Sequence, residues 1–179
     1  MTKTLMMFSL AATAGLIACS KAPEKVAEKM IESAMQKDGT KAKVDLSSGS
    51  AKITTTDASG KTTHVEMGAA KVSESDLGLP FYPGATPGEG GSSKVSTPEG
   101  SMYTVLLHTA DPADKVAAFY RERLKALSTG KQFMDVSGGD GGANLVLADE
   151  QSKNSIQVHI TRAEKGTDVQ IIASRATTK

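Results

Sequence analysis

The amino-terminal stretch limits what this chain can fold into more than any other feature of the sequence. Lys3 is followed by an uncharged, mostly apolar run of thirteen residues, Leu5 to Ile17, and then by small Ala18 and Cys19. A positive residue, an apolar run of this length and a small residue before a cleavage point are typical of an export signal. The run is too short for a good transmembrane helix, which takes about 20 apolar residues. The remainder is therefore expected to fold as a soluble domain.

The end of this signal carries a short motif. Leu16-Ile17-Ala18-Cys19 resembles the bacterial lipobox, in which a leucine, a small or apolar residue and a small residue precede an invariant cysteine. The resemblance implies that the Cys19 thiol receives a diacylglyceryl group, and that a lipoprotein signal peptidase recognises Leu16, Ile17 and Ala18 and cleaves before Cys19. Residues 1–18 would then be the signal peptide, and the mature protein would begin at an acylated Cys19. The alternative is an ordinary secretory signal that contains a cysteine.

The same resemblance implies a place in the cell. Each methylene that an acyl chain buries in the bilayer adds about 0.8 kcal/mol to the free energy of membrane binding. Two or more acyl chains therefore hold a protein stably on a bilayer. Ser20 occupies the position at which an aspartate would resemble the inner-membrane retention signal. In a Gram-negative cell this favours the outer membrane, with the folded part facing the periplasm. We therefore expect a lipid-anchored protein of the cell envelope, whose membrane partner is reached through Cys19.

Composition narrows the remaining classes of function. Removal of residues 1–18 takes away one of the 21 basic residues and none of the 20 acidic ones, so the mature chain has zero net charge. Such a chain has no global field that attracts nucleic acid, and a nucleic-acid partner is not expected. With Cys19 acylated, no cysteine remains for a disulfide, a thiolate metal site or a redox pair, and we expect no cofactor. Packing must supply the stability.

Residues 19–72 are expected to form a small unit of one helix and a β-meander. Between Ala22 and about Lys37 the apolar residues recur at the three-and-four spacing of one helix face. They are Val26, Ala27, Met30, Ile31, Ala34 and Met35. Lysines of the other face precede glutamates by three residues, which indicates solvated surface pairs. Short runs at residues 43–46, 51–54 and 62–67 predict three antiparallel strands, and the helix can cover one face of their sheet.

Residues 73–93 are rich in Gly and Pro, lack periodicity and are interpreted as a connector. Within it, Leu79-Pro80-Phe81-Tyr82-Pro83-Gly84-Ala85 resembles the L-P-x-Y-P-G-A element of uncharacterised bacterial envelope lipoproteins. In those proteins too it lies between a small amino-terminal unit and a carboxy-terminal helix-on-sheet unit. The prolines impose extended backbone, so Phe81 and Tyr82 have fixed directions. Their rings either hold the connector to a neighbouring sheet or form an exposed aromatic pair for a ligand.

Residues 94–179 are expected to form a second unit, in which one helix packs on an antiparallel sheet. The predicted order is β-β-α-β-β-β-β. The strands are expected at residues 94–97, 101–108, 132–136, 143–148, 155–162 and 168–174. The helix has Asp111 as its predicted N-cap, Pro112 in its first turn and Gly130 at its end. Together with the first unit, this order predicts the α+β fold class.

No catalytic or metal-binding motif stands out. His64, His108 and His159 are far apart on predicted strands and have no partner at ligand spacing. The glycine-rich run at residues 138–142 lacks the pattern of a phosphate-binding loop and precedes a strand, so a hairpin tip is favoured. The cations near the end of the second helix, Arg123 among them, suit the negative pole of the helix dipole.

These observations favour a non-enzymatic binding or scaffolding module, whose partner is an envelope protein or a small ligand. The alternative is an envelope hydrolase, or an inhibitor of an enzyme, with a site that the fold assembles from Tyr82, His108, His159 and Arg123. A deep polar pocket that joins at least two of these residues would favour the enzyme. An exposed apolar patch around Phe81 and Tyr82 would favour the binding module.

Overall fold

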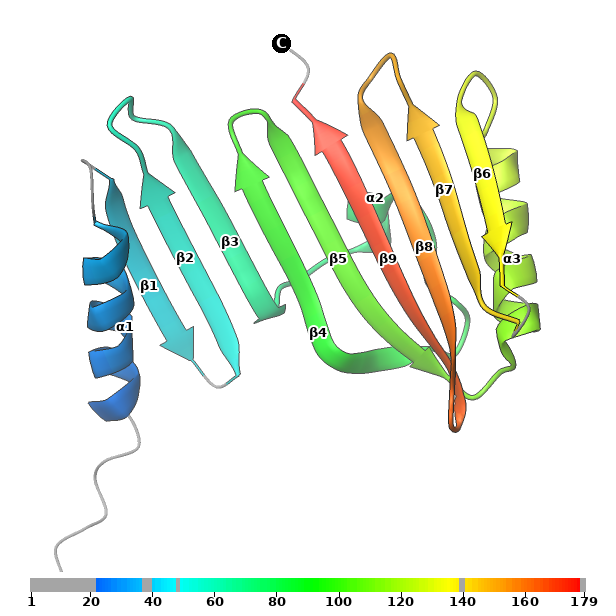
Figure 1. Ribbon diagram of the computed structural model, residues 1–179, viewed down its shortest axis with the longest axis horizontal. Coiled ribbons are helices and arrows are strands. Elements are labelled where there is room, and N and C mark those ends of the chain that lie inside the picture. The colour runs from blue at the N-terminus through cyan, green and yellow to red at the C-terminus, as the bar shows by residue number, and fades with distance from the viewer. Residues whose placement is uncertain (1–21, 37–39, 48, 139–140, 178–179) are drawn as a thin grey trace, which may run out of the picture.

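A computed structural model describes residues 22–36, 40–47, 49–138 and 141–177. Its strands form one antiparallel sheet in the order β1-β2-β3-β4-β5-β9-β8-β7-β6 (Figure 1). The strands are β1 (Lys41–Ser47), β2 (Ser50–Thr56), β3 (Thr62–Ala69), β4 (Thr86–Thr97), β5 (Gly100–Thr109), β6 (Gln132–Ser137), β7 (Ala143–Asp149), β8 (Asn154–Ala163) and β9 (Gly166–Ala176). The helices of the described residues are α1 (Ala22–Met35), α2 (Glu74–Leu77) and α3 (Ala113–Ala126).

The predicted α+β class is wrong, because the molecule is mainly one nine-stranded sheet. The two units expected at 19–72 and 94–179 share that sheet: β3 pairs with β4, and Val65 lies opposite Val95. Eight of the twelve residues of β4 come from the segment interpreted as a connector, since the strand begins at Thr86. At the β3–β4 irregularity a side chain on Gly91 would collide with the Gly68 carbonyl, so glycine permits the pairing there.

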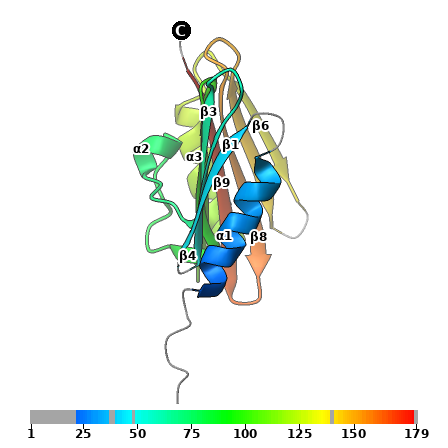
Figure 2. The same ribbon diagram turned by 90° about the vertical axis from the view of Figure 1, so that its left-hand side faces the viewer.

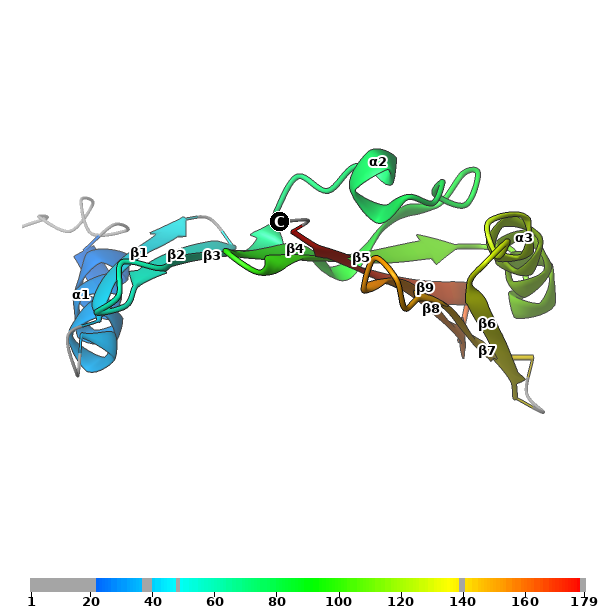
Figure 3. The same ribbon diagram turned by 90° about the horizontal axis from the view of Figure 1, so that it is seen from above.

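The hydrophobic core lies between the second half of the sheet and the elements that cover it. α3 contacts β6, β7, β8 and β9, while α2 contacts β9. Both helices lie on the same face of the sheet (Figure 3). Alternate residues of the strands point into this core, as in the paired row of Leu107, Val169 and Ile160, all of them buried. We call this side the helix-covered face and its reverse the open face.

Local signals of the sequence explain α2, which holds the connector in place. Ser73 and Asp76 form a capping box, and Gly78 ends the helix in the left-handed conformation. Leu77 and Leu79 are buried in the core on either side of this turn. The Arg175 side chain of β9 donates a hydrogen bond to the Leu77 carbonyl. The short helix is therefore fastened to the sheet by both packing and a hydrogen bond.

The ends of α3 differ from those predicted. Pro112 is the N-cap, without a capping hydrogen bond from a side chain, and the helix stops at Ala126 rather than near Gly130. Asp111 does not cap the helix; its carboxylate accepts hydrogen bonds from the Tyr82 hydroxyl at 2.6 Å and from the Lys115 ammonium at 2.9 Å. Asp111 therefore joins the connector to the first turn of α3.

α1 packs differently from the predicted helix-on-meander arrangement. It lies along the edge strand β1, on the side of the sheet opposite α2 and α3 (Figure 2). The Glu28 and Glu32 carboxylates, expected on a solvated face, instead accept hydrogen bonds from β1 backbone N–H groups. Val26 and Met30 of the predicted core-facing stripe are 59% and 69% exposed. The prediction that this stripe packs on the meander is wrong for these two residues.

Candidate functional site

The aromatic pair of the connector lies against the core. The Tyr82 residue is only 5% exposed, and its ring packs edge-on against Phe119 with the centroids 5.2 Å apart. Phe81 is half-buried against the same cluster. Burial and the hydrogen bond to Asp111 raise the pKa of the Tyr82 phenol, and the same bond lowers the pKa of Asp111. Tyr82 therefore holds the connector to α3 and offers no free ring to a ligand.

The four residues of the predicted enzyme site are divided by the sheet. Leu107 and Ile160 point into the core, so their neighbours His108 and His159 lie on the open face. Tyr82 lies on the helix-covered face, where the Arg123 guanidinium stacks 5.1 Å from the ring of Phe119. Since a sheet separates the two pairs, the fold does not assemble these residues into one site.

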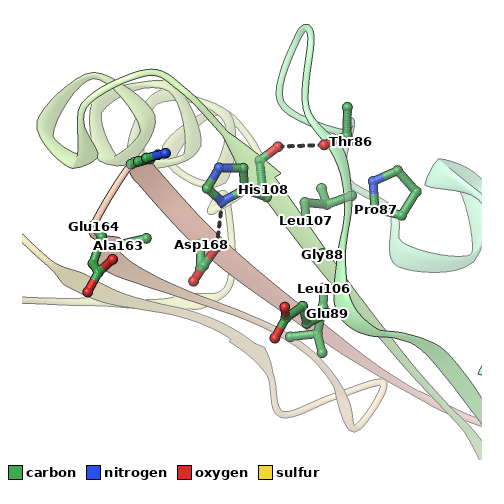
Figure 4. Close-up of a pocket in the computed structure, with 11 residues that line it drawn as sticks. Thr86, Pro87, Gly88, Glu89, Leu106, Leu107, His108, Ala163, Glu164 and Asp168 are labelled. Carbon is green, nitrogen blue, oxygen red and sulfur yellow. Dashed lines mark hydrogen bonds and ion pairs between the residues drawn. The ribbon is translucent and has the colours of Figure 1, made fainter.

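His108 lines a pocket of about 680 Å³, where β4, β5 and the β8–β9 turn meet (Figure 4). Its Nδ1 lies 2.7 Å from the Asp168 carboxylate on the neighbouring strand β9. Glu89, Glu164 and Lys165 also line the pocket, so acidic and basic groups are mixed there. The pocket is partly open to solvent, and its lining comes from β4, β5, β8 and β9 and from the turn between β8 and β9.

The chemistry available in this pocket is limited. Asp168 can orient the His108 ring, as a base in a catalytic triad requires. The Thr86 hydroxyl is the only hydroxyl among the lining residues that the structure describes, and it donates to the His108 backbone carbonyl at 3.4 Å. The described residues contain no cluster of three or more His, Cys, Asp or Glu arranged to hold a metal ion. The pocket therefore offers a hydrogen-bonding pair without an activated nucleophile.

The first half of the open face carries a row of aliphatic side chains. Opposed residues on neighbouring strands share one face, and Ile53, Val65, Val95 and Met102 are paired in turn across β2, β3, β4 and β5. Met67, next to this row, is 46% exposed. No helix of the described residues lies over β2 to β4 on this face (Figure 3). We call these five residues the open-face stripe.

Reasoning from the sequence missed the open-face stripe. The alternation that reveals it is present, as in Val65 and Met67 of β3, separated by Glu66 on the reverse face. From the sequence alone, this alternation predicts one side of a small meander that the first helix covers. The pairing of β3 with β4 instead extends the aliphatic row into the second half of the chain.

The predicted lipidation site, Cys19 with Leu16, Ile17 and Ala18, lies outside the described residues. Within them, no helix combines the length and apolarity needed to cross a bilayer. His64, the third histidine, lies on β3, where its ring is 3.1 Å from the Thr54 hydroxyl. Searches of protein-family models, curated proteins and solved structures found no match to this chain.

Proposed function

We propose that this protein is a lipid-anchored lipoprotein of the cell envelope that acts as a non-enzymatic binding or scaffolding module. The lipobox-like Leu16-Ile17-Ala18-Cys19 supports the anchor. The open-face stripe is the observation that carries the binding role. An uncovered aliphatic row rimmed by polar residues, here Thr and Ser, is typical of a surface that meets a protein partner. The anchor holds that surface close to the membrane.

The arrangement of polar groups supports a binding role over the enzyme alternative. Tyr82 and Arg123 lie on one face of the sheet, and His108 and His159 lie on the other. Catalysis requires groups within hydrogen-bond reach of one reacting centre. Of the four predicted residues, His108 has a carboxylate partner, Asp168, which the prediction did not include. The one hydroxyl among the described lining residues of its pocket, that of Thr86, donates to the His108 backbone carbonyl.

Cell fractionation tests the anchor. The wild-type protein is expected in the outer-membrane fraction, and Cys19→Ser is expected to abolish its processing as a lipoprotein and remove it from that fraction. Ser20→Ala, which keeps the thiol, is the matched control and should fractionate as the wild type. Membrane association of Cys19→Ser equal to that of the wild type would contradict the anchor.

Site-specific photocrosslinking in intact cells tests the binding surface. A photoreactive side chain at Met67 lies on the open-face stripe, and one at the adjacent Glu66 lies on the reverse face of the same strand. Met67 is expected to give a discrete adduct of higher mass, and Glu66 is expected to give little or none. Absence of an adduct from Met67 in correctly localised protein would contradict a protein partner on the stripe.

A further inference from the structure

The glutamates of α1 point toward the sheet. β1 is an edge strand, and its outward N–H groups at Val44 and Leu46 donate to the carboxylates of Glu32 and Glu28, each at 2.8 Å. Gln36 continues the series, since its side-chain amide donates to the Ala42 carbonyl at 3.3 Å. Successive contacts are four residues apart on α1 and two residues apart on β1. Four helix residues rise about 6 Å and two strand residues about 6.6 Å, so the same spacing is kept along both elements.

Two apolar residues of the same helix, Val26 and Met30, point away from the sheet. Residues two positions apart in an α-helix differ in direction by about 200°, at 3.6 residues per turn. Val26 and Met30 each lie two positions from Glu28, and they therefore face nearly opposite to it. Their exposures of 59% and 69% agree with this direction. On α1 the Glu28 and Glu32 carboxylates thus point inward while Val26 and Met30 point outward, the reverse of the usual arrangement on a surface helix.

Two lysines lie beside this outward apolar face. Lys25 and Lys29 are both exposed, and each is adjacent in sequence to Val26 or Met30. Because Glu28 and Glu32 bond to β1, the other charges of α1 are the two lysines and Glu24, two positive against one negative. An apolar face flanked by lysines is the pattern of a helix that lies in the interface of a bilayer containing anionic lipids.

The position of α1 in the chain favours a bilayer over any other occupant. The helix begins at Ala22, three residues after Cys19. Three residues span at most about 11 Å even when fully extended. If Cys19 carries the acyl chains, the first turn of α1 must lie within that distance of the lipid surface.

We propose that the outward face of α1, formed by Val26 and Met30 with Lys25 and Lys29, lies in the headgroup region of the bilayer as a second membrane contact. This inference rests on the proposed acylation of Cys19. Since α1 runs along β1, the contact places β1 next to the membrane and the opposite edge strand, β6, farthest from it.

Fluorescence quenching on vesicles tests the proposal. The acylated full chain, with Met30→Cys labelled by a polarity-sensitive fluorophore, is reconstituted into vesicles of phosphatidylethanolamine and phosphatidylglycerol that contain a spin-labelled lipid. The label at position 30 is expected to shift to shorter wavelength and to be quenched. The same label on Gln151→Cys, in the β7–β8 turn, is expected to stay unquenched. Mass spectrometry of the same sample reports the acyl groups on Cys19.

A matched pair of second substitutions excludes insertion driven by the label itself. Val26→Ser, added to the labelled Met30→Cys protein, is expected to lower the quenching several-fold. Val136→Ser, at an equally exposed valine of β6 (67%), is expected to leave it unchanged. Circular dichroism shows that both variants keep their fold.

The possible results separate this inference from the proposed function. Lipid quenching at position 30 in acylated protein supports both. An acylated protein whose label stays in water, or is shielded by a second protein chain without lipid quenching, overturns the helix contact and leaves the anchor intact. Absence of acyl mass on Cys19 overturns the anchor and the inference with it.

Discussion

The side-chain carboxylate of Glu32 accepts a hydrogen bond from the backbone N–H of Val44 at 2.8 Å, and Glu28 does the same for Leu46. An edge strand with free N–H groups is a template for pairing with another chain. At these positions the α1 carboxylates accept the hydrogen bonds of the β1 N–H groups. Another strand therefore cannot pair with this edge of the nine-stranded sheet. The relationship also sets which face of α1 points outward.

Replacement of both carboxylates should release the β1 edge. Glu28→Ala/Glu32→Ala is expected to cost about 1–3 kcal/mol of unfolding free energy, because two charge-assisted hydrogen bonds are lost. Hydrogen exchange of the Val44 and Leu46 amides should accelerate, and self-association by sedimentation should appear. Glu28→Gln/Glu32→Gln keeps an acceptor oxygen and should behave nearly as the wild type. Equal exchange rates in the Ala variant and the wild type would rule out the edge contact.

Substitution by alanine of two adjacent aromatic residues of α3 should lower the free energy of unfolding by different amounts. Tyr120 is fully buried, and Phe119 is only partly buried. Tyr120→Ala is therefore expected to lose about 3–5 kcal/mol of unfolding free energy, the usual range for a large buried aromatic group. Phe119→Ala should lose clearly less. Denaturant unfolding measures both, and a reversed order would mean that α3 is rotated relative to the sheet.

Tyr82 should stabilise the connector mainly through its buried ring. Tyr82→Ala is expected to lower the melting temperature strongly, whereas Tyr82→Phe, which removes only the hydrogen bond to Asp111, should lower it slightly. In the wild type, spectrophotometric titration should show this phenol ionising above its ordinary pKa, chiefly because the ring is buried. A Tyr82→Phe variant as unstable as Tyr82→Ala would show that the hydroxyl, rather than the ring, holds the connector.

The ion pair between α3 and β6 predicts a pH dependence. The Asp135 carboxylate pairs with Arg121, and the hydrogen bonds from that guanidinium lower the Asp135 pKa below its ordinary 3.8. A lowered folded-state pKa contributes stability that is present above the unfolded pKa and is lost as pH falls through the folded one. Asp135→Asn should cost about 0.5–1 kcal/mol at pH 7, typical of a partly exposed pair.

Unfolding measurements of the wild type and of Asp135→Asn at several pH values also provide the control for this prediction. Because the wild-type carboxylate is protonated below its folded pKa, which lies under 3.8, the difference between wild type and Asp135→Asn should disappear as the pH falls through that pKa. Unfolding by urea at several pH values measures it. A difference that stays constant across the series would show that the substitution acts through packing and not through charge.

Local signals in the sequence located several elements well. The three-and-four spacing predicted a helix from Ala22 to about Lys37, and α1 is observed at Ala22–Met35. The gap between the runs predicted as strands at residues 51–54 and 62–67 contains the observed turn between β2 and β3, where the Asp57 carboxylate accepts a hydrogen bond from the Ser59 N–H at 2.8 Å. These features depend on neighbouring residues alone. Such short-range patterns do not specify which strands pair across long separations.

The errors arose where distant segments meet. Residues 88–93 belong to the segment that its Gly and Pro content and its lack of periodicity predict to be a connector, yet Gly91 is needed at the irregularity where β4 pairs with Gly68 of β3. Glu28 and Glu32 were placed on a solvated face, because their partners, the free N–H groups of β1, exist only once β1 is the edge of the sheet. The sheet order therefore had to be known before either role could be recognised.

The acylation of Cys19 can be measured by mass spectrometry of the native protein purified from envelope membranes. We expect an amino-terminal peptide that begins at Cys19 and carries a diacylglyceryl group on sulfur and a further acyl chain on its amino group. A mature amino terminus elsewhere, or a Cys19 that reacts freely with a thiol reagent and carries no lipid, would contradict it.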